Sequence, residues 1–335
     1  MRTAQIPNDV RESLEGAQSG RGNSRPGARR RIVVVVRQSR LDVLLKRHNT
    51  VNMARYQVER LGDDFDSYLL ENLRNTVARE SVMEELEDFD GIVTLERSQL
   101  PDFVFQPEDV VVVLGQDGLV ANTLKYLDGQ PVVGVNPDPA RWDGLLLPFA
   151  PSDLDKVLPE VLADRRRFKD VTMAQATLND GQTLLAVNDF FIGPKSHTSA
   201  LYRISVGDRQ EEQSSSGVIV STGLGSTGWM RSVVAGAIGM AGSLSSNGAK
   251  VSEPKGLSWN ADRLRFAVRE PFPTRVTGAS LVYGEFGRNN PLHVLSHMPA
   301  GGVVFSDGME DDFLSFPSGV EAVITIAERK GRLVV

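Results

Sequence analysis

Hydrophobic positions divide the chain into two parts with different periodicities. Between residues 32 and 136, short apolar runs alternate with stretches that repeat at helical spacing. We expect strands at Ile32–Val36, Ile92–Leu95, Val110–Leu114 and Pro131–Val135, and helices at Leu41–Arg60, at Asn72–Leu86 and directly after Asp117. Fully apolar strands that alternate with helices are typical of a parallel sheet covered on both faces.

From Val171 onward the hydrophobic pattern changes. Short alternating or apolar segments are separated by Gly, Pro, Asn and Asp, which predicts antiparallel β-strands. Strands are expected at Thr183–Val187, Ala200–Val206, Gly217–Ser221, Leu264–Val268, Val276–Tyr283, Gly302–Phe305 and Ala322–Ile326. A helix is predicted at Leu154–Arg167. A second one, at Val233–Leu244, is rich in Ala, Gly and Ser, and we expect it to pack closely against neighbouring backbone.

The predicted fold is therefore an α/β domain over residues 31–150 followed by a β-rich domain over residues 151–335. The sequence leaves open whether the last strands return to the first domain. Residues 1–30 are polar and rich in arginine and glycine, so we expect a disordered tail there.

Composition narrows the classes of function. The net charge of −6 is modest and of mixed sign, so neither nucleic acid nor an acidic membrane surface is an expected partner. The absence of cysteine excludes disulfides, thiolate catalysis and Cys-ligated zinc, and it fits a cytoplasmic enzyme. No stretch is long and apolar enough to span a membrane. The four histidines form no convincing ligand set, and no residue is predicted as a metal ligand.

The stretch Val110–Lys125 carries the strongest candidate chemistry. Its strand runs into Gly115-Gln116-Asp117-Gly118, and helical spacing begins at once. Such a turn lies at the carboxyl end of a strand, where open α/β sheets bind ligands, and a helix N-terminus there favours phosphate. Asp117 would repel phosphate unless it binds a hydroxyl group or a metal ion. Capping of the helix explains this aspartate equally well.

A second glycine-rich turn, Gly223–Gly228, has the spacing G-x-G-x-x-G after an apolar strand. A dinucleotide fingerprint requires an acidic residue about 20 positions later, and residues 229–252 contain neither Asp nor Glu. Two alternatives stay open: a turn whose amides and hydroxyls hold phosphate or ribose, and a tight connection capped by Ser226 or Thr227.

Two shorter polar segments also follow strands. Asn188 and Asp189 offer donors and acceptors suited to hydroxyl groups or an amide, although an Asx turn is the more frequent meaning of such a pair. Ser306-Asp307-Gly308 is interpreted as a turn.

Taken in order, these segments resemble the NAD kinase family. GQDG (Gly115–Gly118) resembles its GGDG loop, Asn188-Asp189 its Asn-Glu pair, and STGLGSTGW (Ser221–Trp229) its TGSTAY-like loop. Gly134-Val135-Asn136-Pro137 resembles the family's GIN segment, and SDGMEDDFLSFPSG resembles its C-terminal part. The similarity covers roughly residues 32–335 and is greatest with the mitochondrial-type branch and its bacterial relatives.

The resemblance implies a β-sandwich-like second domain, with NAD bound between the domains. It implies transfer of the ATP γ-phosphoryl group to the 2′-hydroxyl of the NAD adenosine ribose, with Mg²⁺ as divalent metal, in a homodimer or tetramer. Asp117 would orient the hydroxyl and accept its proton. The remaining roles fall on two groups: Gly115, Gln116 and Gly118 beside phosphate, and Asn188, Asp189, Gly225, Ser226 and Thr227 around NAD.

Several residues depart from the family pattern. Gln116 replaces the second glycine of GGDG, Leu119 replaces a Thr or Ser, and Asp189 replaces a Glu. Gly223-Leu224 also replaces the usual Pro-Thr or Gly-Thr. If the second glycine of GGDG serves a positive φ angle, Gln116 carries strain. These departures leave two alternatives to an NAD kinase: a related kinase that acts on a lipid, sugar or nucleoside, and a dinucleotide-binding sensor without catalysis.

Overall fold

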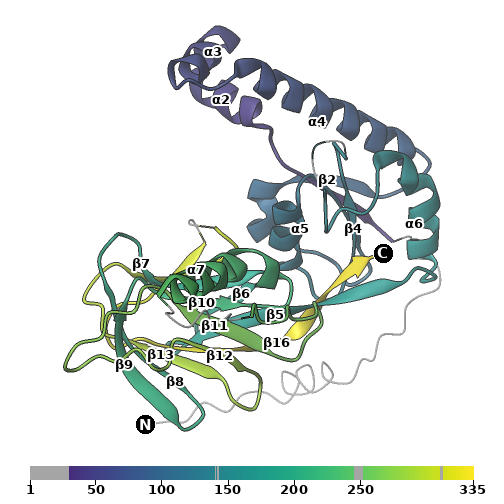
Figure 1. Cartoon of the computed structure of the whole chain (residues 1–335). Helices are drawn as coiled ribbons and strands as arrows, with labels where there is room; N and C mark the ends of the chain where they lie inside the picture. The colour runs from purple at the N-terminus through teal and green to yellow at the C-terminus, as the bar shows by residue number, and fades with distance from the viewer. Residues whose placement is uncertain (1–29, 140, 142, 245–251, 310–311) are drawn as a thin grey trace, which may run out of the picture.

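The computed structural model describes residues 30–139, 141, 143–244, 252–309 and 312–335. The tail predicted at residues 1–30 lies outside the described residues, apart from Arg30. Figure 1 shows two layered halves, with a long helix lying over the first and yellow C-terminal strands running from the second back to it. Within the described ranges, no helix has both the length and the hydropathy required to cross a bilayer.

The first half contains the predicted parallel sheet, in the order β2-β1-β3-β4. Its strands are β1 (Ile32–Val36), β2 (Ile92–Glu96), β3 (Val110–Leu114) and β4 (Pro131–Val135). Every residue of β1, β3 and β4 is buried. The helix α5 (Asp117–Leu124) packs on one face, and α4 (Phe65–Glu85) and α6 (Leu154–Leu162) pack on the other. The apolar runs are therefore strands covered on both faces, as expected.

Helix boundaries differ from the prediction in three places. The stretch Leu41–Arg60 forms two helices, α2 (Arg40–His48) and α3 (Val51–Arg60). Asn49 ends the first at a left-handed φ of 62°, and Thr50 caps the second by accepting from the Met53 amide at 3.2 Å. Helix α4 begins at Phe65, seven residues before the predicted start, because Asp64 caps it there. Leu73 and Val77 lie on its exposed side. Helix α6 ends at Leu162, and β5 starts six residues later.

The second half consists of two facing sheets. The strands not yet named are β5 (Phe168–Leu178), β6 (Thr183–Ala186), β7 (Asp189–Pro194), β8 (Ala200–Val206), β9 (Arg209–Ser215), β10 (Val218–Ser221), β11 (Leu264–Val268), β12 (Tyr283–Phe286), β13 (Leu292–Ser296), β14 (Gly302–Ser306), β15 (Phe313–Ser315) and β16 (Glu321–Val334). One sheet has the order β12-β11-β10-β7-β14-β15. A single core cluster draws residues from both sheets, which confirms the sandwich-like layout.

Strand β16 connects the two halves. It pairs antiparallel with β5 and β13, and then parallel with β4, where Arg332 and Leu333 lie opposite Pro131 and Val132. A break in register between Ile326 and Lys330 bends it on the way. The parallel sheet and half of the sandwich are thus one continuous sheet.

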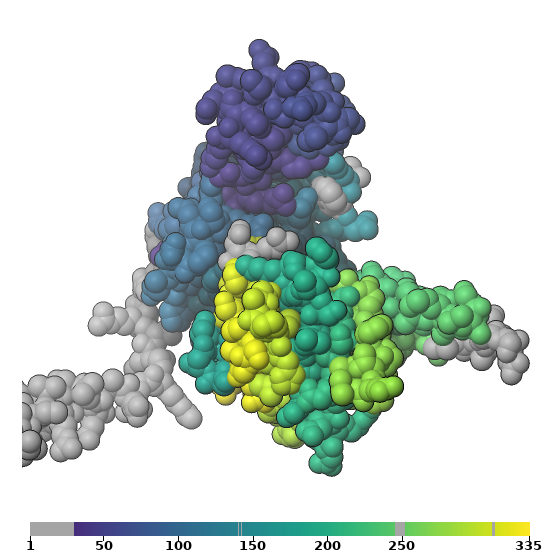
Figure 2. Space-filling view, turned by 90° about the vertical axis from the view of Figure 1, so that its left-hand side faces the viewer, coloured from purple at the N-terminus to yellow at the C-terminus, as the bar shows by residue number. Residues whose placement is uncertain are grey.

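Two predictions about the second half are wrong. The segment predicted as a strand at Val276–Tyr283 forms no strand before Tyr283, and Val276 is 80% exposed. The helix α7 (Trp229–Leu244) exists, but it does not pack closely: Met230 is buried, while Met240 and Leu244 are exposed. Three of its glycines have open space where a Cβ atom would stand. Figure 2 shows this green helix standing away from the body.

The stability of the sandwich should depend on its inner face and not on the loop near residue 276. Val294 is fully buried in the core cluster between the sheets. We expect Val294→Ala to lower the free energy of unfolding by about 2–3 kcal/mol through lost burial and a residual cavity. The matched change Val276→Ala should alter it by less than about 0.5 kcal/mol. Chemical denaturation compares the two, and equal effects would contradict this assignment of the core.

Candidate active site

A cavity of about 390 Å³ opens where the two halves meet. The first half contributes Asp117 and Gly118 at the start of α5, with Leu145 and Leu146 from the loop after β4. The second half contributes Asn188 and Asp189, the turn around Gly225 and Thr227, and Asp307. Six of the sequence-predicted site residues therefore line one cavity: Asp117, Gly118, Asn188, Asp189, Gly225 and Thr227.

The carboxylate of Asp117 is held by the loop after β4. The backbone amide of Leu146 donates to its Oδ1 at 2.8 Å, and the amide of Leu145 donates to its Oδ2 at 3.3 Å. The cap position belongs to Gln116, whose side chain makes no capping bond. The interpretation of Asp117 as a helix cap is therefore wrong. Each oxygen keeps a further lone pair for a ligand, so the carboxylate is fixed in direction and still able to accept a proton.

Two glycines bring that loop within reach of Asp117. A Cβ atom at Gly134 would overlap the carbonyl oxygen of Leu146, so only glycine allows this approach. Gly144 has a φ of 57°, in the left-handed region that glycine adopts without strain. The segment Gly134–Pro137, singled out in the sequence, thus shapes the site through its backbone.

Asn188 and Asp189 stand at the start of β7, where Asp307 fixes them. One carboxylate oxygen of Asp307 accepts from the amides of Asn188 at 2.6 Å and Asp189 at 3.2 Å, and the other accepts from Val187 at 3.0 Å. Three backbone amides thus converge on one side chain. Within the described residues, the side chains of Asn188 and Asp189 have no hydrogen-bond partner, and they remain available to a ligand.

The carboxyl groups of Asp189 and Asp307 both have pKa values above the ordinary range. Burial raises the pKa of Asp189 to about 7, and the negative charge of Asp307 adds to this effect. Burial also raises the pKa of Asp307, while its three amide donors and the Lys125 ammonium act in the opposite direction. Near neutral pH, Asp189 is therefore divided between an ionised acceptor and a neutral acid that can donate.

The second glycine-rich turn packs directly on the Asn-Asp pair. The amide of Thr222 donates to the Asn188 carbonyl at 2.9 Å, and its hydroxyl donates to the Val187 carbonyl at 2.6 Å. A Cβ atom at Gly225 would overlap the Asn188 carbonyl oxygen. Thr227 lines the cavity, whereas Ser226 does not, and the Ser226 hydroxyl donates to the Gly223 carbonyl at 2.7 Å. The turn therefore presents Gly225 and Thr227 to the cavity.

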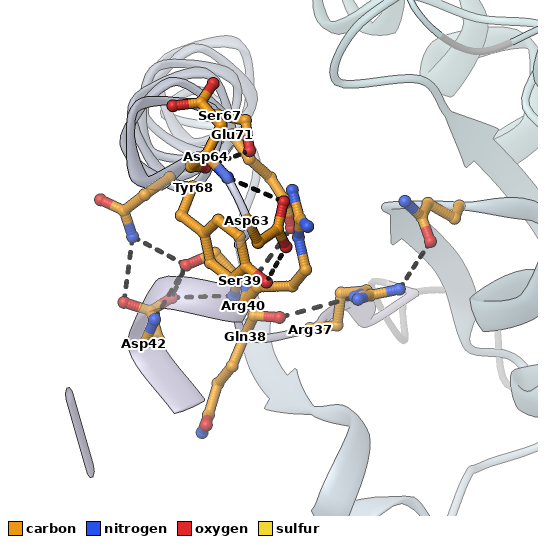
Figure 3. Close-up of polar contacts among 12 residues, drawn as sticks. Arg37, Gln38, Ser39, Arg40, Asp42, Asp63, Asp64, Ser67, Tyr68 and Glu71 are labelled. Carbon is orange, nitrogen blue, oxygen red and sulfur yellow. Dashed lines mark hydrogen bonds and ion pairs between the residues drawn. The ribbon is translucent and has the colours of Figure 1, made fainter. Parts of the chain in front are cut away.

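Gly115 and Gln116 lie beside a different cavity, below the helical arm α2–α4. Gln116 has an extended backbone, with φ −116° and ψ 163°, so the side chain that replaces the family's glycine causes no backbone strain. Its Oε1 accepts from Nη1 of Arg37 at 2.6 Å. Figure 3 shows Arg37 directed away from the arm, while Arg40 faces Tyr68 and Glu71 on α4. Leu119 is buried against Gly115 in the core.

Sequence reasoning missed Asp307 and Lys125. Asp307 was interpreted as a turn residue, and it does adopt a left-handed φ of 54°. Asp307 binds backbone amides that are distant in sequence, so no local pattern predicts these hydrogen bonds. The one signal available in the sequence was an acidic residue directly after an apolar strand. The ammonium group of Lys125 binds the Ser306 hydroxyl at 2.6 Å and Asp312 at 2.9 Å, which ties α5 to the end of β14.

No protein-family model matches the chain. The chain is 27% identical over 273 residues to mitochondrial NAD kinase 2 of Rattus norvegicus, covering 65% of this chain and 63% of the relative. It is 27% identical over 262 residues to the Homo sapiens protein of that name, covering 62% and 58%. NAD kinase 1 of Nostoc is 30% identical over 141 residues, covering 37% and 45%. The chain thus spans less than two thirds of these relatives.

Solved structures share the fold over nearly the whole chain. Yeast NADH kinase complexed with NADH superposes with a TM-score of 0.58 at 14% identity, covering 92% of this chain and 84% of that one. An NAD kinase from Archaeoglobus fulgidus in complex with ATP superposes with a TM-score of 0.54 at 16% identity, covering 91% and 93%. The chain is thus similar in sequence to NAD kinases over part of its length, and it shares its fold with the solved NAD and NADH kinases.

Proposed function

We propose that the protein is an NAD kinase, which transfers the γ-phosphoryl group of ATP to the 2′-hydroxyl of the NAD adenosine ribose and forms NADP. One observation carries the proposal: the fixed carboxylate of Asp117 and the side chains of Asn188 and Asp189 line one cavity between the two halves. Hydroxyl groups of a ribose suit this set, because carboxylate and amide oxygens accept from them and the amide nitrogen donates to them.

Asp117 would act as the base. Its two amide bonds to the loop after β4 hold the carboxylate toward the cavity before a substrate arrives. The ribose 2′-oxygen forms a bond to the γ-phosphorus while the bond from that phosphorus to the β–γ bridging oxygen breaks. ADP leaves, and the hydroxyl proton resides on Asp117. Alignment of the two reactants supplies much of the rate, because the protein itself forms no covalent bond.

A magnesium ion would enter with ATP. Mg²⁺ is usually held by one or two carboxylates together with substrate phosphates. In the part of the chain that the structure describes, no group of three or more His, Asp or Glu side chains could form a complete metal site. Asp117 would be the protein ligand to a metal carried by the nucleotide. When bound, the ion offsets the negative charge of the phosphates.

Nothing in the described residues favours the alternatives. The sensor hypothesis rested on Gln116 and Leu119, and the structure accommodates both without strain at the loop. No observation singles out a lipid, sugar or nucleoside as acceptor. A homodimer or tetramer and a cytoplasmic location remain predictions from the sequence and its family resemblance.

Replacement of Asp117 by asparagine separates catalysis from binding. The amide oxygen can still accept from Leu146, so the loop should hold, but the group no longer accepts a proton. We expect turnover to fall by about 10²–10⁴-fold with little change in NAD affinity. A coupled assay for NADP formation measures turnover, and calorimetry measures NAD binding. Turnover equal to that of the wild-type protein would remove Asp117 from the mechanism.

The affinity for NAD should depend on pH through Asp189. Its pKa is about 7 because of burial, so a rise in pH through that value creates the ionised acceptor for a ribose hydroxyl. We therefore expect NAD to bind more tightly above this pH than below it, and Asp189→Asn to flatten the profile. Asp307 and Asp117 face the same cavity and stay unchanged in the variant. Calorimetric titrations at several pH values test this, and identical profiles would exclude the role of Asp189.

Gln116 should assist the reaction and not obstruct it. Its hydrogen bond fixes the Arg37 guanidinium beside the glycine-rich loop. We expect Gln116→Ala to raise the KM for ATP by roughly threefold to tenfold, which corresponds to the net contribution of one ordinary hydrogen bond. The KM for NAD should not change. Higher activity in the variant would show that the Gln116 side chain blocks the phosphate position.

A further inference from the structure

One ion pair joins the helical arm to the loop that holds Asp117. The guanidinium of Arg74 on α4 donates to the Asp138 carboxylate in the loop after β4, with Nη1 and Oδ2 2.5 Å apart. The Asp138 side chain is 12% exposed and that of Arg74 is 39% exposed. Water screens such a pair only in part, so it holds the two segments together more firmly than a pair on the open surface does.

Arg74 stands near the middle of α4, and this helix is anchored at both ends. Figure 1 shows α4 running from the tip of the arm toward α6. The C-terminal half of α4 packs on the parallel sheet through Ala78 and Val82, while its first residue, Phe65, belongs to the small core of the arm. The position of Arg74 relative to the sheet is therefore fixed, and its side chain is a firm support for Asp138.

Asn136 connects Asp138 to the part of the loop that holds Asp117. Its side-chain oxygen accepts from the Asp138 amide at 3.0 Å, and its own amide donates to the Phe149 carbonyl at 2.8 Å. Asn136 is buried, and a Cβ atom at Gly144 would overlap its side-chain nitrogen. The Asp138 side and the Gly144 side of the loop therefore pack on one buried asparagine.

The two residues that follow Gly144 supply the amides that bind Asp117. The Gly144 carbonyl accepts from the Leu147 amide at 2.9 Å, and this turn directs the amides of Leu145 and Leu146 at the carboxylate. A loop that moved would turn the carboxylate with it. A base must be aligned with the proton that it accepts, and a displacement of about 1 Å can cost about 100-fold in rate.

We propose that Arg74 is a positioning residue for the reaction: its ion pair with Asp138 keeps the loop after β4 in the place where that loop orients the Asp117 carboxylate. The inference rests on the proposed function and adds to it a residue of the helical arm. Arg74 lines the cavity below the arm and not the cavity that Asp117 faces. Its effect on turnover therefore passes through the loop.

Two matched variants separate this role from a general effect on the arm. Arg40 forms an ion pair with Glu71 whose side chains are 38% and 13% exposed, but this pair joins α2 to α4 within the arm. We expect Arg74→Met to lower the kcat of NADP formation about tenfold, and to change the KM for NAD and for ATP by less than about twofold. Arg40→Met should retain the wild-type kcat, although chemical denaturation should show a similar loss of stability in both variants.

Two further measurements test the ion pair and the loop directly. Arg74→Lys keeps the positive charge, so its kcat should stay within about threefold of the wild-type value. Amide hydrogen exchange at Leu145 and Leu146 reports the position of the loop without turnover. We expect exchange there to be about tenfold faster in Arg74→Met, and unchanged in Arg40→Met, because only the first variant releases the loop.

Each contrary result has a defined meaning. A wild-type kcat in Arg74→Met, or unchanged exchange at Leu146, would overturn the proposal, and so would an Arg74→Lys variant as slow as Arg74→Met. A higher KM for ATP at constant kcat would also overturn it, because Arg74 would then contact the donor itself. Absence of NADP formation by the wild-type protein would reject the proposed function, and the exchange measurement would still decide whether Arg74 holds the loop.

Discussion

The pairing of β16 with β4 is the constraint on which the candidate site depends. It makes one sheet run from the parallel α/β half into the sandwich, so the halves are joined by backbone hydrogen bonds and not only by a linker. Asp117 and Asn188 belong to different halves, and a rigid junction is what keeps them on the same cavity. Lys125 adds a second tie, from α5 to the end of β14.

Charge burial is concentrated where the chemistry is proposed. Asp307 gives up most of its contact with water and receives three amide donors in return, and its negative charge helps to keep a proton on Asp189. Such an arrangement costs stability, because two carboxyl groups in a weakly hydrated region repel each other when both ionise. The stability of the fold alone gives no reason to keep this arrangement. The need to hold the start of β7 beside a polar ligand gives one.

The sequence predicted those features that local patterns encode. The apolar runs at Ile32–Val36 and Val110–Leu114 are the strands observed, and the order of the glycine-rich turns carries the resemblance to NAD kinases. Features that depend on distant partners were not predictable. The hydrogen bonds of Asp307 go to amides more than a hundred residues away, so no local pattern predicts them. The small residues of α7 predicted close packing, but no neighbouring element lies near its glycines. The break at Asn49 was missed because helical spacing continues across it.

The contact between Gly225 and the Asn188 carbonyl links two segments that are far apart in sequence. Since any side chain at residue 225 would displace the backbone of Asn188, the two motifs behave as one structural unit. Change in either is tolerated only if the other shifts with it, so substitutions at the pair should be strongly non-additive. A new acceptor specificity in this fold would therefore require simultaneous changes in both segments. Such a combination is harder to reach by evolution than the exchange of single side chains along the cavity wall.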